Sequence, residues 1–124
     1  MRIAVLDDNQ SVCEMLQQYL ELEGYSVVVY CSPSKFLVNI IEPTTASTPF
    51  DLLIVDLFLS EGMSGGEVIH QVRKIFPDLP VILISAASAW EIEAAKRALP
   101  TVRVLRKPFS MASLLALLQE LKHE

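Results

Sequence analysis

Residues 52–56 read Leu-Leu-Ile-Val-Asp, four apolar residues that end in an acid. A strand without alternating polar residues is buried on both faces, which is typical of a parallel sheet covered by helices. Two other short apolar runs share this form: residues 3–6, followed by Asp7, and residues 81–84, followed by Ser85. The same three segments therefore predict the centre of a sheet and polar residues at its edge.

Segments with helical character separate these runs. Residues 11–23 carry apolar side chains three and four positions apart, and Gly24 follows as a stop signal. Residues 26–30 are rich in valine and predict a second strand. Ser32 as the cap, with Pro33 at the first helical position, predicts a helix through residue 41.

The second half of the chain continues this alternation. Helices are predicted over 66–76, 89–99 and 110–122, the last capped by Ser110, and a fifth strand over 102–105. Residues 43–49 and 60–65 have loop composition. Five strands that alternate with five helices predict an α/β fold, a parallel sheet with helices on both faces joined by right-handed crossovers.

Length and composition limit the possible classes. The chain has 124 residues, which fits one domain, and 52% of them are hydrophobic, which argues against disorder. No apolar run approaches the ~18 residues of a membrane span, and the N-terminus lacks a signal-peptide layout. We therefore expect a cytoplasmic protein without a membrane partner. The net charge of −5 argues against direct nucleic-acid binding.

Several conspicuous residues have ordinary interpretations. Cys13 and Cys31 are far apart in the sequence and lack metal-ligand spacing, so we expect two free, mostly buried thiols. We expect His70 and His123 to be structural or solvated. Trp90 is either an exposed contact or simply packed, and both alternatives stay open.

Polar residues follow four of the predicted strands: Asp7, Asp8, Asp56, Ser85 and Lys107. In open α/β sheets ligands bind at the carboxyl ends of the strands. Carboxylates that lie close together repel, and a hard cation such as Mg²⁺ relieves this repulsion. An aspartate can carry a phosphoryl group, and positive groups around that group lower the barrier to its transfer. The pattern predicts Mg²⁺-dependent phosphoryl transfer, with Lys107 as a fixed cation and the Ser85 hydroxyl as a donor.

The set Asp7-Asp8, Asp56, Ser85-Ala86 and Lys107-Pro108-Phe109 resembles the receiver domain of two-component response regulators, of the chemotaxis-regulator type. The resemblance covers essentially the whole chain, residues 1–124. It implies a flavodoxin-like, doubly wound five-stranded parallel sheet, (βα)5, with strand order 2-1-3-4-5.

The resemblance also implies roles for individual residues. Asp56 is the phosphoacceptor, Ser85 and Lys107 contact the phosphoryl oxygens, and the Lys107–Pro108 peptide bond is expected to be cis. Asp8 binds Mg²⁺ directly and Asp7 mainly through water. The expected metal ligands are therefore Asp7, Asp8, Asp56 and the backbone carbonyl of Phe58.

By resemblance, the phosphodonor is a phosphohistidine on a sensor histidine kinase or phosphotransfer protein, which acetyl phosphate could replace. The added negative charge shifts the surface between two conformations and so controls an effector or output domain. No turnover of outside substrates is expected. A phosphorylation-linked homodimer is compatible with this function, although nothing in the sequence requires it.

The loop after Asp56 departs from the receiver pattern. Ser60 takes the place of a proline, and the nearest matching glycine, Gly65, comes one residue late. Residues 60–61 therefore look like a one-residue insertion.

Two further departures concern the switch and the phosphoryl lifetime. Val104 stands where an aromatic switch residue is common, which leaves Ser85 as the other switch residue. Phe58 and Ala87, both apolar, flank the phosphoryl position. From this pair we expect poor orientation of the attacking water and slow self-dephosphorylation.

The residues argue against two other functions of similar folds. A haloacid-dehalogenase-like phosphatase would need a second aspartate where Phe58 stands, and a flavin-binding domain would not place acids directly after its first strand. A constitutive, phosphorylation-independent interaction module of the same fold remains the main alternative. The sequence does not decide between a stand-alone receiver and part of a longer regulator or hybrid kinase.

Overall fold

The computed structural model describes residues 1–41, 50–59, 62–99 and 101–122. The predicted loop at 43–49, the predicted insertion at 60–61 and His123 lie outside these ranges. Strands and helices alternate in this order: β1 (Arg2–Leu6), α1 (Gln10–Leu22), β2 (Ser26–Tyr30), α2 (Pro33–Ile41), β3 (Leu52–Asp56), α3 (Gly65–Ile75), β4 (Val81–Ser85), α4 (Ala89–Ala98), β5 (Arg103–Arg106) and α5 (Met111–Lys122). Each begins and ends within about one residue of its predicted position.

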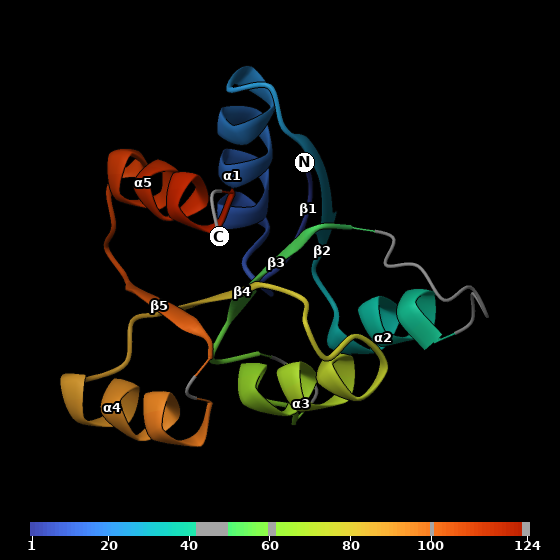
Figure 1. The fold of residues 1–124 in the computed structure, drawn as a ribbon, viewed down its shortest axis with the longest axis vertical. Coiled ribbons are helices and arrows are strands. Elements are labelled where there is room, and N and C mark those ends of the chain that lie inside the picture. The colour runs from blue at the N-terminus through green and yellow to red at the C-terminus, as the bar shows by residue number, and fades with distance from the viewer. Residues whose placement is uncertain (42–49, 60–61, 100, 123–124) are drawn as a thin grey trace.

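The sheet has the order β2-β1-β3-β4-β5, and all neighbouring strands are parallel. Helices α1 and α5 cover one face, and α2, α3 and α4 lie on the other (Figure 1). The predicted doubly wound fold and its strand order are confirmed. In this topology the carboxyl ends of β1 and β3 are neighbours, so residues that follow the two strands meet at one edge.

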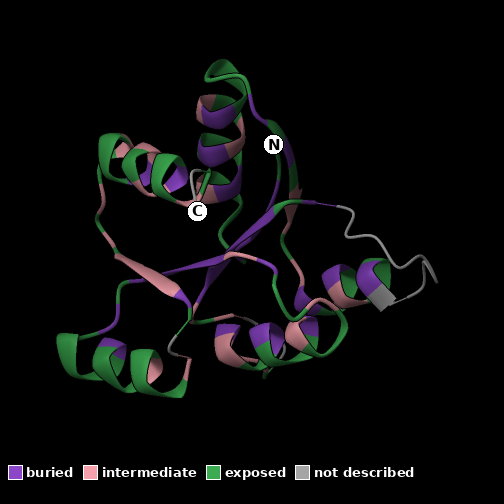
Figure 2. Ribbon diagram, viewed as in Figure 1, coloured by how far each residue is buried: buried purple, intermediate pink, exposed green. Residues whose placement is uncertain are grey.

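The strands divide the core into two halves, because successive side chains of a strand point to opposite faces. In β3, Leu52 and Ile54 pack with residues of α1 and α5, while Leu53 and Val55 pack with residues of α2 and α3. All residues of β3 and β4 are buried. Figure 2 shows this buried centre with helices exposed on their outer faces.

Side-chain caps begin the helices that follow the site. Ser110 Oγ accepts a hydrogen bond from the Ser113 backbone N–H at 3.1 Å, as the sequence predicted for α5. Three caps were not predicted: Asn9 for α1, Ser64 for α3 and Ser88 for α4. Each satisfies backbone donors that the first helical turn leaves without partners.

Two exposures refine the sequence interpretation. Cys13 is buried but Cys31 is exposed, so the prediction of two mostly buried thiols is wrong for Cys31, which follows β2 at the surface. The Trp90 side chain is 75% exposed, which favours a surface contact over packing. Within the described ranges, none of the helices has both the length and the apolar character needed to cross a membrane.

Gly65 lets α3 begin directly against the end of β3. Its backbone N–H donates to the Leu57 carbonyl at 2.7 Å, and a Cβ atom at this position would overlap the Asp56 carbonyl oxygen. An antiparallel bridge between Phe58 and Ser64 joins the two ends of the same loop. Both ends of the loop that carries the predicted insertion are thus held next to Asp56.

Replacing Gly65 with alanine should lower the free energy of unfolding by about 1–3 kcal/mol, the usual cost of overpacking. The new methyl group forces α3 and the β3 end apart, because backbone atoms oppose it. Urea unfolding measures the effect. Gly66→Ala is the matched control: its Cβ would make only ordinary contacts, the nearest at 3.7 Å. Equal stabilities of the two variants would contradict the close approach.

Candidate functional site

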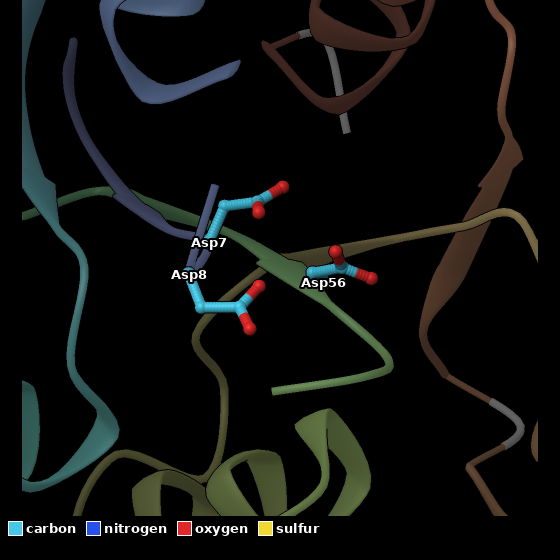
Figure 3. A group of neighbouring side chains, drawn as sticks. All are labelled: Asp7, Asp8 and Asp56. Atoms are coloured by element: carbon cyan, nitrogen blue, oxygen red, sulfur yellow. The ribbon is translucent and has the colours of Figure 1, made fainter. Parts of the chain in front are cut away.

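The carboxylates of Asp7, Asp8 and Asp56 meet at the carboxyl edge of the sheet. One oxygen of each lies within 4.8 Å of the others (Figure 3). Asp7 and Asp56 are buried, whereas Asp8 is exposed at the mouth of the group. The first two residues directly follow β1 and the third ends β3, so the parallel pairing of these strands creates the cluster.

Burial raises the pKa of Asp7, and the charge of Asp56 raises it further. The Asn9 backbone N–H, which donates to Asp7 Oδ1 at 2.9 Å, and the Lys107 ammonium oppose this shift without cancelling it. The Asn9 donor and the Lys107 charge thus do not offset burial and the Asp56 charge, and the pKa of Asp7 stays above its usual value. A bound cation would supply the missing charge.

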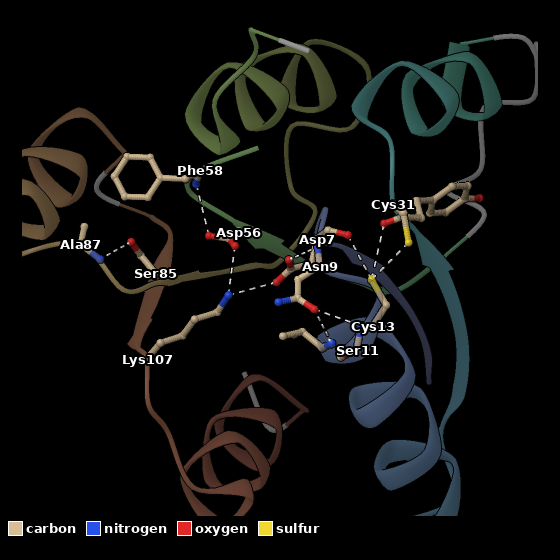
Figure 4. Close-up of polar contacts among 12 residues, drawn as sticks. Asp7, Asn9, Ser11, Cys13, Cys31, Asp56, Phe58, Ser85, Ala87 and Lys107 are labelled. Atoms are coloured by element: carbon tan, nitrogen blue, oxygen red, sulfur yellow. Dashed lines mark hydrogen bonds and ion pairs between the residues drawn. The ribbon is translucent and has the colours of Figure 1, made fainter. Parts of the chain in front are cut away.

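Lys107 is the fixed positive charge of the site. Its Nζ donates to Asp56 Oδ2 at 3.0 Å and to Asp7 Oδ2 at 3.2 Å (Figure 4). Burial alone would lower the pKa of Lys107, but the hydrogen bond to Asp56 and the charges of both aspartates outweigh it, and the pKa is raised. The side chain therefore stays protonated. The peptide bond to Pro108 is cis, as expected.

The backbone after Asp56 is also fixed. The Phe58 N–H donates to Asp56 Oδ1 at 3.2 Å, and the Leu57 N–H donates to the Ile84 carbonyl on β4 at 2.9 Å. Asp56 Oδ1 and Oδ2 thus accept from opposite partners, the backbone on one side and Lys107 on the other. The Phe58 ring is 53% exposed beside this group.

Ser85 ends β4, next to the strand that ends in Asp56, and is fully buried. Its Oγ accepts a hydrogen bond from the Ala87 N–H at 2.9 Å, so the hydroxyl lies toward its own loop in this conformation (Figure 4). The Ser85 carbonyl accepts from the Lys107 N–H at 2.7 Å, which joins the ends of β4 and β5. Val104 lies opposite Leu83 and packs against the core on the α2–α3 side.

Two residues near the acidic group were not predicted. Asn9 caps α1, accepting from the Ser11 N–H at 3.0 Å while its own N–H holds Asp7. An asparagine just before a helical segment was the available signal. Cys13 Sγ donates to the Asp7 carbonyl at 3.1 Å. Burial, followed by the neighbouring Cys31, raises the pKa of Cys13 to about 12, so its thiol remains a neutral donor.

The donor set fits a small, hard divalent cation. All three side chains offer oxygen atoms, which Mg²⁺ prefers, and one of them is open to solvent. Three acids face one lysine in this group, and burial, together with the charge of Asp56, raises the pKa of Asp7. Softer metals that favour sulfur or imidazole would find no such ligand among these three side chains.

A family model, curated relatives and a solved structure all indicate one protein family. The family model for the response regulator receiver domain matches residues 3–119. The response regulator MprA of Mycobacterium avium (strain 104) is 32% identical over 121 residues, covering 98% of this chain and 50% of that protein. The uncharacterized transcriptional regulatory protein YkoG of Bacillus subtilis (strain 168) is 30% identical over 114 residues, covering 92% and 47%.

A solved structure agrees with the sequence relatives. The response regulator protein TrrA of Thermotoga maritima, in complex with Mg(2+)-BeF, matches with a TM-score of 0.79 and 28% identity over 97% of each chain. The chain spans about half the length of the curated relatives MprA and YkoG. Fold, sequence and the residues at the sheet edge agree, and the chain belongs to the family of response regulator receiver domains.

Proposed function

We propose that this receiver domain accepts a phosphoryl group on Asp56 with the help of Mg²⁺ and switches its surface in response. The observation that supports this best is the meeting of three carboxylates with Lys107, whose Nζ lies 3.0 Å from Asp56 Oδ2. Asp56 is buried and lies next to the exposed Asp8, so we expect a donor to approach from the Asp8 side.

In this proposal Asp7, Asp8, Asp56 and the backbone carbonyl of Phe58 hold the metal ion. When bound, Mg²⁺ would neutralise the negative charge that the acids and the incoming phosphoryl oxygens bring together. The hydrogen bond from the Phe58 N–H to Asp56 supports this placement, because it fixes the Phe58 backbone beside the carboxylates.

An Asp56 carboxylate oxygen forms the new bond to phosphorus, while the bond from phosphorus to the donor nitrogen breaks and the electron pair leaves with the histidine. Lys107 remains protonated and faces the charge that develops on the phosphoryl oxygens. Ser85 Oγ, which now accepts from the Ala87 N–H, would turn to donate to a phosphoryl oxygen and draw its loop inward. This movement is the proposed switch, and Val104, the other predicted switch residue, lies opposite Leu83 on the neighbouring strand.

The partners follow from the same chemistry. The donor would be a phosphohistidine on a sensor histidine kinase or phosphotransfer protein in the cytoplasm. The receiver would control an effector or an output domain, and a phosphorylation-linked homodimer fits the same scheme. MprA is named a response regulator and YkoG a transcriptional regulatory protein, and both are about twice the length of this chain. These relatives support an output domain that regulates transcription.

Incubation with Mg²⁺ and acetyl phosphate should add one phosphoryl group to the protein, because Asp56 meets both a metal site and a fixed cation. Intact-mass measurement detects the adduct. Asp56→Asn should lose it, and Asp78→Asn, an exposed acid on another surface, should keep it. Chelation of Mg²⁺ should abolish the adduct in the wild type and in Asp78→Asn.

Two results would contradict the proposal. One is an unchanged adduct on Asp56→Asn. The other is a folded, Mg²⁺-binding wild type that neither acetyl phosphate nor a panel of histidine kinases can phosphorylate, which would favour the constitutive interaction module.

The phosphoryl group should be long-lived, because the half-exposed Phe58 ring and the buried Ala87 methyl offer the attacking water no hydrogen-bond partner. Phe58→Asn should shorten the lifetime by about tenfold or more, because its amide could orient the attacking water; this is less than the ~10²–10⁴-fold that a side chain transferring a proton contributes. Loss of the phosphoryl group is followed by intact mass after donor removal. Leu22→Asn, at an exposed apolar position on α1, serves as the control. A lifetime of seconds in the wild type, not shortened by Phe58→Asn, would refute this hypothesis.

A further inference from the structure

The two cysteines of the chain lie side by side although 18 positions separate them. Cys13 belongs to α1 and Cys31 directly follows β2, and their Sγ atoms are 3.8 Å apart (Figure 4). A disulfide bond is about 2.05 Å long, so the sulfurs would need to approach by roughly 2 Å. Cys31 is exposed, so its side chain is the one with room to rotate toward Cys13.

The exposures of the two thiols differ in a useful way. Cys31 is exposed and Cys13 is buried behind it. Reversible redox chemistry commonly uses an accessible thiol with a second, resolving thiol next to it. Exchange would therefore begin at Cys31 and end at Cys13.

We propose that Cys13 and Cys31 are a modification site that forms a reversible disulfide by exchange with a small-molecule disulfide. The new bond lowers the affinity of the acidic group for Mg²⁺ by displacing Asp7. Disulfide formation goes beyond the proposed phosphoacceptor function and does not depend on it. Only the effect on Asp7 rests on the metal site of that function.

The exchange balances in two steps with glutathione disulfide as the oxidant. The Cys31 sulfur, as thiolate, attacks one sulfur of the oxidant, and a mixed disulfide forms while one glutathione leaves. The Cys13 thiol must then give its proton to a base from solution; the resulting thiolate attacks the Cys31 sulfur, and the second glutathione leaves as a thiolate that takes up a proton. Two protein thiols are oxidised, and their two electrons and two protons end on two glutathione molecules. Excess thiol reverses both steps.

The buried sulfur connects this pair to the acidic group. Cys13 Sγ donates its only hydrogen to the Asp7 carbonyl at 3.1 Å, and the Asp7 N–H donates to the Tyr30 carbonyl, one residue before Cys31. Oxidation removes the thiol hydrogen and draws the sulfur toward Cys31. The Asp7 carbonyl loses this donor, and the β1–α1 turn that holds Asp7 and Asp8 must adjust.

The first test incubates the full chain in glutathione redox buffers, followed by alkylation and peptide mass mapping. We expect a Cys13–Cys31 crosslink, about 2 Da lighter than the reduced protein and reversed by excess thiol. Cys13→Ala should stop at a glutathione adduct on Cys31, and Cys31→Ser should give neither product. Oxidation of the wild type that stops at the adduct, or that yields only intermolecular crosslinks, would overturn the proposed site.

The second test compares Mg²⁺ affinity of the reduced and oxidised wild type by calorimetric titration, without any phosphodonor. We expect the affinity to fall by about tenfold on oxidation, the lower end of the effect of a lost supporting hydrogen bond at a metal site. Cys31→Ser treated with the same oxidant should keep the affinity of the reduced protein. Equal affinities of the two wild-type forms, with the crosslink present, would overturn the connection to Asp7 but not the disulfide.

Discussion

The repulsion among the carboxylates of Asp7, Asp8 and Asp56 is the constraint on which the rest of the site depends. Their oxygens lie within 4.8 Å of one another, and two of the three residues are buried. Such a group is held together by the strong parallel pairing of β1 with β3, which is buried on both faces of the sheet. The stability of the core thus maintains an arrangement that the acids themselves oppose.

A lysine and two backbone N–H groups offset part of the repulsion among these acids. Lys107 directly follows β5, two strands away from β3, and bridges Asp7 and Asp56, so the charge balance also joins distant parts of the sheet. The Asn9 and Phe58 backbone N–H groups add donors from the two adjoining loops. A phosphoryl group on Asp56 would add negative charge to this group. The loops that begin at the acids would then be expected to change conformation.

The loops that follow β3 and β4 are tightly packed. Gly65 places α3 against the backbone of Asp56, and the Ser85 hydroxyl is buried and already engaged by its own loop. Under the proposed function, the Ser85 hydroxyl would exchange its hydrogen bond with the Ala87 N–H for one to the phosphoryl group. That exchange would carry the signal into the β4–α4 loop.

Much of this could be predicted from the sequence, because it depends on local patterns. Apolar runs ending in Asp56 or Ser85 predicted both the strands and the edge at which the polar residues meet, and the cis bond before Pro108 followed from the family resemblance. The pairing of Cys13 with Cys31 could not be predicted, because it depends on how α1 lies across the end of β2. The exposure of Cys31 was missed for the same reason.

The cap residues show a second limit. Asn9, Ser64 and Ser88 lie just outside the predicted helices, where apolar periodicity gives no signal and only the cap chemistry does. The sequence also gives no sign that Asn9, besides capping α1, donates its backbone N–H to the Asp7 carboxylate. Such double roles become visible only when the turn is folded.

Titration of the protein with Mg²⁺ shows directly whether the three clustered acids bind a cation. We expect one site per chain, with an affinity that falls by at least about tenfold in Asp8→Asn and is unchanged in Asp78→Asn. Absence of Mg²⁺ binding by the folded wild type, or equal affinities of the wild type and Asp8→Asn, would show that the acidic group is not a metal site.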